Sequence, residues 1–327
     1  MTISNILLCQ LCAGIALTLC APFVGAQTYP NKTIRIIVPI TPGGGQDFVA
    51  RLIGQKLAVA LGQQVIIDNR PGAGGNIGTQ LAAKAPPDGY TLVVVAGSYT
   101  AQPSLYARLP YNPVKDFAPI TQLGGQPYLF VVHPSVPAKS VKEFIALARS
   151  EKGKLSYGST GSGELSNLAM ELLKTLGEFD AVHVPYKGAA SASVGLLAKE
   201  VDAFFPATTS GLPHVKSGKV RVLAVTTLKR AAVLPEVPTI AESGFPGYEV
   251  NGWYGLLAPA GTPKEIIAKL HQEVGRILEL TDVKDAQAAN GRIPAPGGNT
   301  PEEFAANINA EIKQWAKVIK QAGIRLD

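Results

Sequence analysis

One run near the start of the chain constrains the fold more than any other part. Residues Thr33 to Val38 are mostly apolar and β-branched, which is typical of a buried strand. Gly43, Gly44 and Gly45 then let the backbone turn sharply, and from Asp47 onward apolar residues recur at helical spacing. A strand that passes through a glycine loop into a helix leaves unpaired N–H groups at the helix start, which favours a bound anion. A plain tight turn is the alternative, and the run alone does not decide between the two.

The same strand, glycine loop and helix return later in the chain. Leu155 to Tyr157 is typical of a short strand, residues 158–163 form a glycine-rich loop, and a helix with an apolar face begins at Leu165. This loop adds hydroxyl groups, which also donate hydrogen bonds. An anion between the two helix starts would gain donors from both, each contributing about 1.5–3 kcal/mol. A few such bonds with burial reach roughly −8 kcal/mol, the micromolar range. Two unrelated turns in an ordinary α/β fold are the opposing interpretation.

Predicted strands and helices alternate along the rest of the chain, which implies parallel sheets covered by helices. The main predicted strands are 64–68, 90–96, 129–132, 155–157, 203–205 and 220–225, and the main predicted helices are 77–85, 141–150, 165–176, 264–280 and 301–322. The series of predicted strands and helices is interrupted near residues 125–129 and again near 248–253. We therefore expect an α/β fold with a parallel-rich sheet in each of two lobes and a two-strand hinge between them.

The expected lobes are discontinuous in sequence. Residues 27–126 plus 250–327 form the first lobe, on which the C-terminal helices are expected to pack, and residues 127–249 form the second. Residues 1–26 carry no charged side chain and end in small residues, so they are expected to be a cleavable export signal that is too short to span a membrane. All three cysteines lie in this segment, so the mature chain is expected to have no disulfide and no cysteine metal site.

Charge and motifs exclude several classes of function. The net charge of +6 is spread along the chain, which argues weakly for anionic ligands and not for nucleic acid. Gly72-Ala73-Gly74 misses the dinucleotide fingerprint because Ile77 stands where the third glycine is needed. Thr160 occupies the nucleophile position of a G-x-S-x-G elbow, and the four histidines lack metal-ligand spacing. We therefore expect no catalysis, cofactor or metal, with an exported α/β hydrolase-like enzyme as the alternative.

Ordered motifs over almost the whole mature chain follow a known pattern. They are 38–47 (VPITPGGGQD), 69–78 (NRPGAGGNIG), 88–92 (DGYTL), 183–188 (HVPYKG), 234–239 (LPEVPT), 258–263 (APAGTP) and 322–324 (AGI). Together they resemble the Bug proteins, the periplasmic receptors of tripartite tricarboxylate transporters. The resemblance implies a two-lobe periplasmic binding protein of type II-like fold that closes on a small carboxylate. It also implies delivery to the membrane subunits of a transporter, and a monomer is expected.

The resemblance also implies which residues bind the ligand. In such receptors the two glycine loops hold one carboxylate, largely through backbone amides and ordered waters. Carried over to this chain, the loop residues are Thr41, Pro42, Gly43, Gly44, Gly45 and Asp47, and Ser159, Thr160, Gly161 and Ser162. Further candidates follow predicted strands, at the edge where α/β sheets bind ligands, with plain loop solvation as their alternative; they are Ser98, Tyr99, Thr208 and Thr209.

Two departures from the family pattern leave the ligand open. Ile40-Thr41-Pro42 stands where Phe-Pro-Ala is common, and Asn167 stands where a histidine is common. The ligand classes that fit are an amino acid, a dicarboxylate, a tricarboxylate and an aromatic acid. An amino acid would need a carboxylate partner for its ammonium group, and the sequence does not place one. An orphan receptor used for signalling fits the same residues.

Overall fold

The computed structural model describes residues 29–151, 153–295 and 297–326, so the predicted export signal lies outside the described residues. The strands are β1 (Ile34–Val38), β2 (Val65–Asn69), β3 (Thr91–Ala96), β4 (Phe117–Gly124), β5 (Leu129–Val132), β6 (Ser156–Ser159), β7 (Val182–Pro185), β8 (Ala203–Phe204), β9 (Arg221–Val225) and β10 (Tyr254–Pro259). The α-helices are α2 (Gly45–Leu61), α3 (Asn76–Ala83), α4 (Gln102–Leu105), α5 (Val141–Ser150), α6 (Leu165–Gly177), α7 (Ala189–Leu197), α8 (Thr208–Lys216), α9 (Lys264–Glu279), α10 (Thr281–Ala289) and α11 (Pro301–Ala322). Short 3₁₀ turns follow β2 and β3 at Ala73–Gly75 and Gly97–Thr100.

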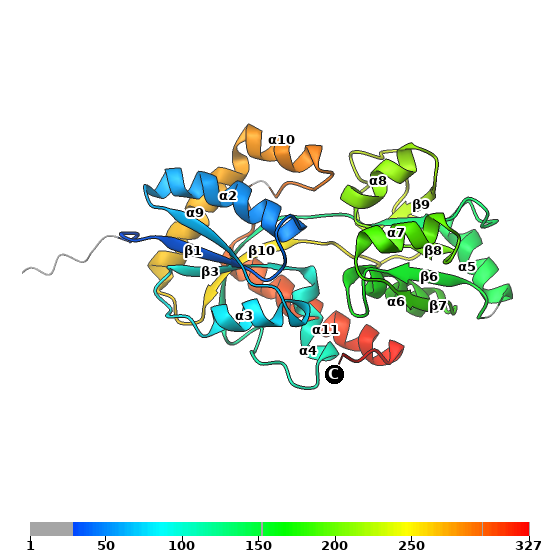
Figure 1. The fold of residues 1–327 in the computed structure, drawn as a ribbon, viewed down its shortest axis with the longest axis horizontal. Helices are drawn as coiled ribbons and strands as arrows, with labels where there is room; N and C mark the ends of the chain where they lie inside the picture. Colours follow the sequence, from blue (N-terminus) through cyan, green and yellow to red (C-terminus); the bar gives the residue numbers. More distant parts are fainter. Residues whose placement is uncertain (1–28, 152, 296, 327) are drawn as a thin grey trace, which may run out of the picture.

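The strands form two five-stranded mixed sheets of the same design (Figure 1). In the order β2-β1-β3-β10-β4, β1 pairs in parallel with β2 and β3, whereas β10 runs antiparallel to β3 and β4. In the order β7-β6-β8-β5-β9, β6 pairs in parallel with β7 and β8, whereas β5 runs antiparallel to β8 and β9. The predicted parallel-rich α/β fold is confirmed, with one reversed strand in each sheet. We call the elements around each sheet the first and the second lobe.

Alternate residues of β1 explain why helices cover both faces of the first sheet. Ile36 packs with Leu57 of α2 and Val274 of α9 in one buried cluster. Its neighbour Ile37 points to the opposite face, where it packs in a second buried cluster with Phe304 of α11. Because both faces are apolar, β1 is hydrophobic at every position except Arg35, whose guanidinium pairs with Asp68 of the neighbouring β2.

The chain crosses between the lobes twice, and the two crossings pair with each other (Figure 1). Pro127 and Asn251 form an isolated antiparallel bridge. The Gly252 amide donates to the Gln126 carbonyl over 2.9 Å, and the Gln126 amide donates to Asn251 Oδ1 over 3.1 Å. A two-stranded connection of this kind permits hinge motion while limiting its direction.

Helix α11 contacts both lobes, although the C-terminal helices were expected to pack on the first lobe. Phe304 and Ile308 in its first half join the core beneath the first sheet. Trp315 and Ile319 in its second half join the main core of the second lobe. The sequence could not show that both lobes share this helix, because an amphipathic helix has the same pattern of apolar residues whether it packs on one lobe or on two. The lobe boundaries at residues 126 and 250 stay a prediction.

Glu311 of α11 gives the junction between the lobes a dependence on pH. Trp253 Nε1 donates to both carboxylate oxygens, over 2.7 and 2.9 Å, and Thr100 Oγ1 donates to Oε2 over 2.9 Å. Burial raises the pKa of Glu311 to about 7, although these hydrogen bonds act in the opposite direction. The folded protein therefore keeps a proton that the unfolded chain releases near 4.5, so the free energy of unfolding falls as pH rises from about 5 to 7.

We expect Glu311→Gln to be more stable than the wild type by about 2 kcal/mol near pH 8 and equal to it near pH 4. Urea unfolding across this pH range measures the difference. Glu236→Gln, which removes a charge from an exposed loop, is the matched control and should not change the slope. Parallel pH profiles for the wild type and Glu311→Gln would contradict the assignment.

Candidate ligand-binding site

A cavity of about 400 Å³ lies between the lobes, and the starts of two helices meet at it. Gly45 is the first residue of α2 and Leu165 the first residue of α6, and both line the wall. Most of the lining comes from the first lobe and the returning crossing: Pro39, Ile40, Thr41, Gln46, Pro71, Gly72, Gly74, Gly75, Thr79, Val95, Ala96, Ser98, Tyr99, Gln102, Tyr111, Gly252 and Tyr254. Tyr128 and Glu164 complete it from the other side.

The carboxylate of Asp47 holds the first glycine loop in place. It accepts hydrogen bonds from the Gly43 amide over 2.9 Å and from Asn69 Nδ2 over 2.9 Å, and it forms an ion pair with Arg51 at 2.9 Å. Burial alone would raise the pKa of Asp47, but the hydrogen bonds from Arg51, Gly43 and Asn69 lower it below its ordinary value. Asp47 is 4% exposed and is not among the residues that line the cavity, so its place in the structure is to hold the loop.

Gly45 marks the place where the first loop needs the absence of a side chain. A Cβ at this position would overlap the hydroxyl oxygen of Tyr254 and lie 3.2 Å from the guanidinium of Arg292. The Tyr254 hydroxyl donates to Gln126 Oε1, to which Arg292 also donates over 3.3 Å. The Arg292 guanidinium stacks on the Phe48 ring, with its carbon 4.8 Å from the ring centroid. A positive charge therefore lies just behind the start of α2.

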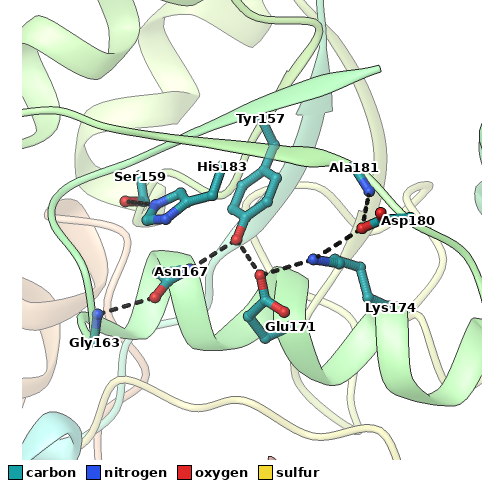
Figure 2. Close-up of polar contacts among 9 residues, drawn as sticks. All are labelled: Tyr157, Ser159, Gly163, Asn167, Glu171, Lys174, Asp180, Ala181 and His183. Atoms are coloured by element: carbon teal, nitrogen blue, oxygen red, sulfur yellow. Dashed lines mark hydrogen bonds and ion pairs between the residues drawn. The ribbon is translucent and has the colours of Figure 1, made fainter. Parts of the chain in front are cut away.

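A polar network in the second lobe holds the second glycine loop (Figure 2). Asn167 accepts from the Gly163 amide over 2.9 Å and donates to the Tyr157 hydroxyl over 2.7 Å, and this hydroxyl donates to Glu171. The His183 ring stacks on Tyr157 at 4.9 Å between centroids, and its Nε2 lies 2.7 Å from Ser159 Oγ. Burial lowers the pKa of His183, which favours its neutral form. His183 therefore acts as a support for the loop.

Some of the predicted site residues line the cavity, and others are not part of its lining. Thr41, Gly45, Ser98 and Tyr99 line the wall, although the Tyr99 hydroxyl is engaged with the Pro113 carbonyl at 2.6 Å. The predicted residues absent from the lining are Pro42, Gly43, Gly44, Asp47, Ser159, Thr160, Gly161, Ser162, Thr208 and Thr209.

The displaced hydroxyl groups have protein partners instead. Thr160 Oγ1 lies 2.8 Å from Ser166 Oγ, within the same loop and helix start. Thr208 Oγ1 donates to the Pro127 carbonyl over 2.7 Å, and Thr209 Oγ1 accepts from Gln126 Nε2 over 2.7 Å. These threonines begin α8 and tie it to the hinge crossing, so proximity to a strand end did not place them on the cavity. Their contact with a ligand stays a prediction.

Several lining residues were not among the sequence candidates. The segment Pro71–Gly75 belongs to a motif that the sequence analysis singled out but did not assign to the site. Tyr254 lies on β10, a strand that the sequence did not predict. Glu164 directly follows the last glycine of the second loop and is the N-cap residue of α6, which was the available signal for its position.

Among the described residues that line the cavity, Glu164 is the one with a charged side chain. Burial raises the pKa of its carboxyl group. Burial also raises the pKa values of Tyr106 and Tyr128, and the nearby negative charge of Glu164 adds to both shifts. The carboxyl group therefore lies near these two tyrosines, on the side of the cavity formed by α6.

The part of the chain that the structure describes holds neither a metal cluster nor a membrane-spanning helix. No group of three or more His, Cys, Asp or Glu residues is placed to hold a metal ion there. No helix among these same residues is long and apolar enough to cross a membrane.

Comparison with known proteins agrees with this geometry. The sequence model of the tripartite tricarboxylate transporter family receptor matches residues 49–324. The chain belongs to that family. As a family member it is a solute-binding receptor, and the Bug resemblance of its motifs is confirmed.

Solved structures of relatives share the fold of this receptor. Rpa4515 of R. palustris with adipate is 37% identical with a TM-score of 0.78, covering 91% of this chain and 100% of that one. MatC (Rpa3494) from Rhodopseudomonas palustris with bound malate is 35% identical with a TM-score of 0.76, covering 89% and 100%. The periplasmic binding protein BugD is 34% identical with a TM-score of 0.76, covering 91% and 100%. The fold is therefore that of periplasmic binding proteins.

Proposed function

We propose that this receptor captures a small organic carboxylate in the cavity between its lobes and delivers it to a tripartite tricarboxylate-type transporter. The observation that carries the proposal is the meeting of two helix starts, at Gly45 and Leu165, on one cavity. The first N–H groups of a helix have no partner within it, and the helix dipole places partial positive charge there. Such a pair of helix starts favours an anion between them.

The first lobe offers the better developed anion position. The loop before α2 is held by Asp47, and the absence of a side chain at Gly45 leaves room for the Tyr254 hydroxyl beside the helix start. The Arg292 guanidinium behind Gly45 adds a full positive charge to the partial charge of the helix. Ser98, which also lines the cavity, is a further hydrogen-bond donor. We assign the ligand carboxylate to this end.

The cavity and the relatives agree on the size of the ligand. A volume of about 400 Å³ is at the lower end of small-molecule sites. The structures of Rpa4515 with adipate and of MatC with malate show that relatives of this receptor hold small aliphatic acids. Hinge rotation at residues 125–128 and 250–253 would let the second lobe close over the ligand, with Leu165 and Glu164 meeting it from that side.

The location and partners follow from this function. Residues 1–26 are proposed to be a cleavable signal that directs the chain to the periplasm, where a monomer meets the membrane subunits of the transporter. The receptor is proposed to catalyse no reaction. An orphan receptor that signals would use the same cavity. An exported α/β hydrolase-like enzyme would need a nucleophile hydrogen-bonded to a base, and no such pair is found among the described residues of the cavity wall.

A thermal-shift screen against a panel of small carboxylates tests the proposal. A ligand at a concentration 1,000 times its Kd stabilises the folded state by about 4.1 kcal/mol, which for a chain of this length raises the Tm by roughly 5–8 °C. We expect at least one acid of the panel to produce such a rise and its methyl ester to produce none. No rise with any acid, together with turnover of an ester or a nucleotide, would favour the enzyme alternative.

A further inference from the structure

Glu164 lines the ligand cavity, and its carboxyl group has no partner among the described residues. Glu164 is the N-cap residue of α6, and its side chain makes no capping hydrogen bond to the helix. It lines the cavity, and no hydrogen bond or ion pair joins its carboxylate to any residue in the described ranges. A half-buried carboxylate without a donor is unfavourable. A cavity that takes only an anion would gain nothing from it.

A second unsatisfied acceptor lies in the same wall. Gln102 is 6% exposed and lines the cavity, and its Nε2 donates to the Gly74 carbonyl over 3.2 Å. This bond fixes the orientation of the amide, because only the nitrogen can donate to a carbonyl. Its Oε1 then receives no hydrogen bond within the described part of the chain. Gln102 lies four residues before Tyr106, whose pKa is raised by burial and by the charge of Glu164.

Groups of opposite charge therefore approach the cavity from different lobes. The first lobe contributes the start of α2 at Gly45, with the Arg292 guanidinium 3.2 Å from where a Cβ of Gly45 would lie. The second lobe contributes Glu164, whose negative charge lies beside the partial positive charge of the α6 start. Complementary potentials determine which partner is accepted more than they determine raw affinity. The ligand that matches such a cavity has a negative group and a positive group.

We propose that Glu164 pairs with an ammonium group of the ligand, so that this receptor selects a small amino acid over the corresponding acid without the amino group. The inference rests on the proposed function and names the substrate class of the same cavity. The ligand carboxylate binds at the start of α2, and its ammonium group donates to Glu164, with Gln102 Oε1 as a second acceptor. A dicarboxylate would instead place its second negative charge against Glu164.

Matched pairs of acids that differ only by an amino group test this proposal. The pairs are aspartate and succinate, glutamate and glutarate, 2-aminoadipate and adipate, and leucine and 4-methylpentanoate, each titrated by calorimetry into the wild type and Glu164→Gln. We expect the wild type to bind the amino member of its preferred pair at least tenfold more tightly. In Glu164→Gln, affinity for that member should fall about 10- to 100-fold, while affinity for its partner stays equal or rises.

Controls separate this inference from the proposed function. Glu178→Gln, an exposed change just beyond the opposite end of α6, should leave the preference unchanged, and equal melting temperatures without ligand show that the variants are folded. A wild type that prefers the acid without the amino group overturns the role of Glu164 and leaves the carboxylate receptor standing. An unchanged preference in Glu164→Gln overturns it as well. Binding of no member of any pair overturns both.

Discussion

Gly45→Val is expected to abolish ligand-induced stabilisation of this receptor, because the added side chain displaces Tyr254 and Arg292 from their places beside the start of α2, where Gly45 and Tyr254 line the cavity. The Cβ alone would overlap the Tyr254 hydroxyl oxygen, and Arg292 lies next to it. Tyr254 would have to move away from Gln126, its hydrogen-bond partner at the hinge. We expect the affinity for the carboxylate ligand to fall at least about 100-fold, the loss of two charge-assisted hydrogen bonds. Isothermal titration with the best acid of the panel measures it.

Two control variants test whether the loss of affinity is specific to position 45. Ala60→Val introduces the same side chain at an exposed site in the last turn of α2 and should leave the affinity unchanged. Gly44→Ala should have a smaller effect than Gly45→Val, because its Cβ would meet only the end of the flexible Ile40 side chain and because Gly44 does not line the cavity. Wild-type affinity in Gly45→Val would remove the start of α2 from the binding site.

Asp47→Ala should destabilise the folded protein by about 3 kcal/mol at neutral pH, because it leaves several groups without their charged partner. The Gly43 amide and the Asn69 side chain would each lose a hydrogen bond of 2.9 Å, and Arg51 would lose its ion pair. Since the first loop is held through Gly43, we also expect ligand affinity to weaken. Urea unfolding measures the stability of the variant, and the ligand titration measures its affinity.

The pH dependence of this loss of stability identifies the Asp47 carboxylate as its cause. The pKa of Asp47 is lower in the folded than in the unfolded state, so its contribution is present above the unfolded value and is lost as pH falls through the folded value. The wild type and Asp47→Ala should therefore converge in stability in strong acid. Arg51→Ala removes only a half-exposed partner and should cost about 1 kcal/mol or less. An equal loss in both variants would assign the effect to the ion pair and not to the loop.

Helices and strands whose apolar residues recur at a clear period could be predicted from the sequence. Elements that are defined by tertiary contacts could not. Helices α5 and α11 match the expected ranges because their apolar residues recur at helical spacing between recognisable ends. Strand β10 was missed because all six of its residues are buried, so no alternation appears, and it contains glycine and proline. Strand β7 was missed because it is short and lies at the edge of its sheet.

The candidate site shows the same division. The two glycine loops pointed to the correct helix starts because backbone flexibility and helix ends are local properties. Which side chains reach the cavity depends on partners far away in the sequence. Thr208 donates to the Pro127 carbonyl and Ser159 Oγ lies against His183, so both hydroxyls have protein partners, and their contact with a ligand stays a prediction. Glu164 was not predicted because a charged residue directly after a glycine loop is expected to be solvated. Its place in the cavity wall depends on the opposite lobe, which the local sequence does not show.

The position of β10 has a consequence for how the polypeptide acquires its structure. The second sheet is built from strands between residues 129 and 225, which are consecutive in the chain. The first sheet needs β10, which inserts between β3 and β4 only after the whole second lobe has been passed. Contacts so distant in sequence form slowly because a long loop must close first. The second sheet is therefore able to form from consecutive strands, while the first sheet waits for residues 254–259 and the second-lobe core for Trp315 and Ile319 of α11.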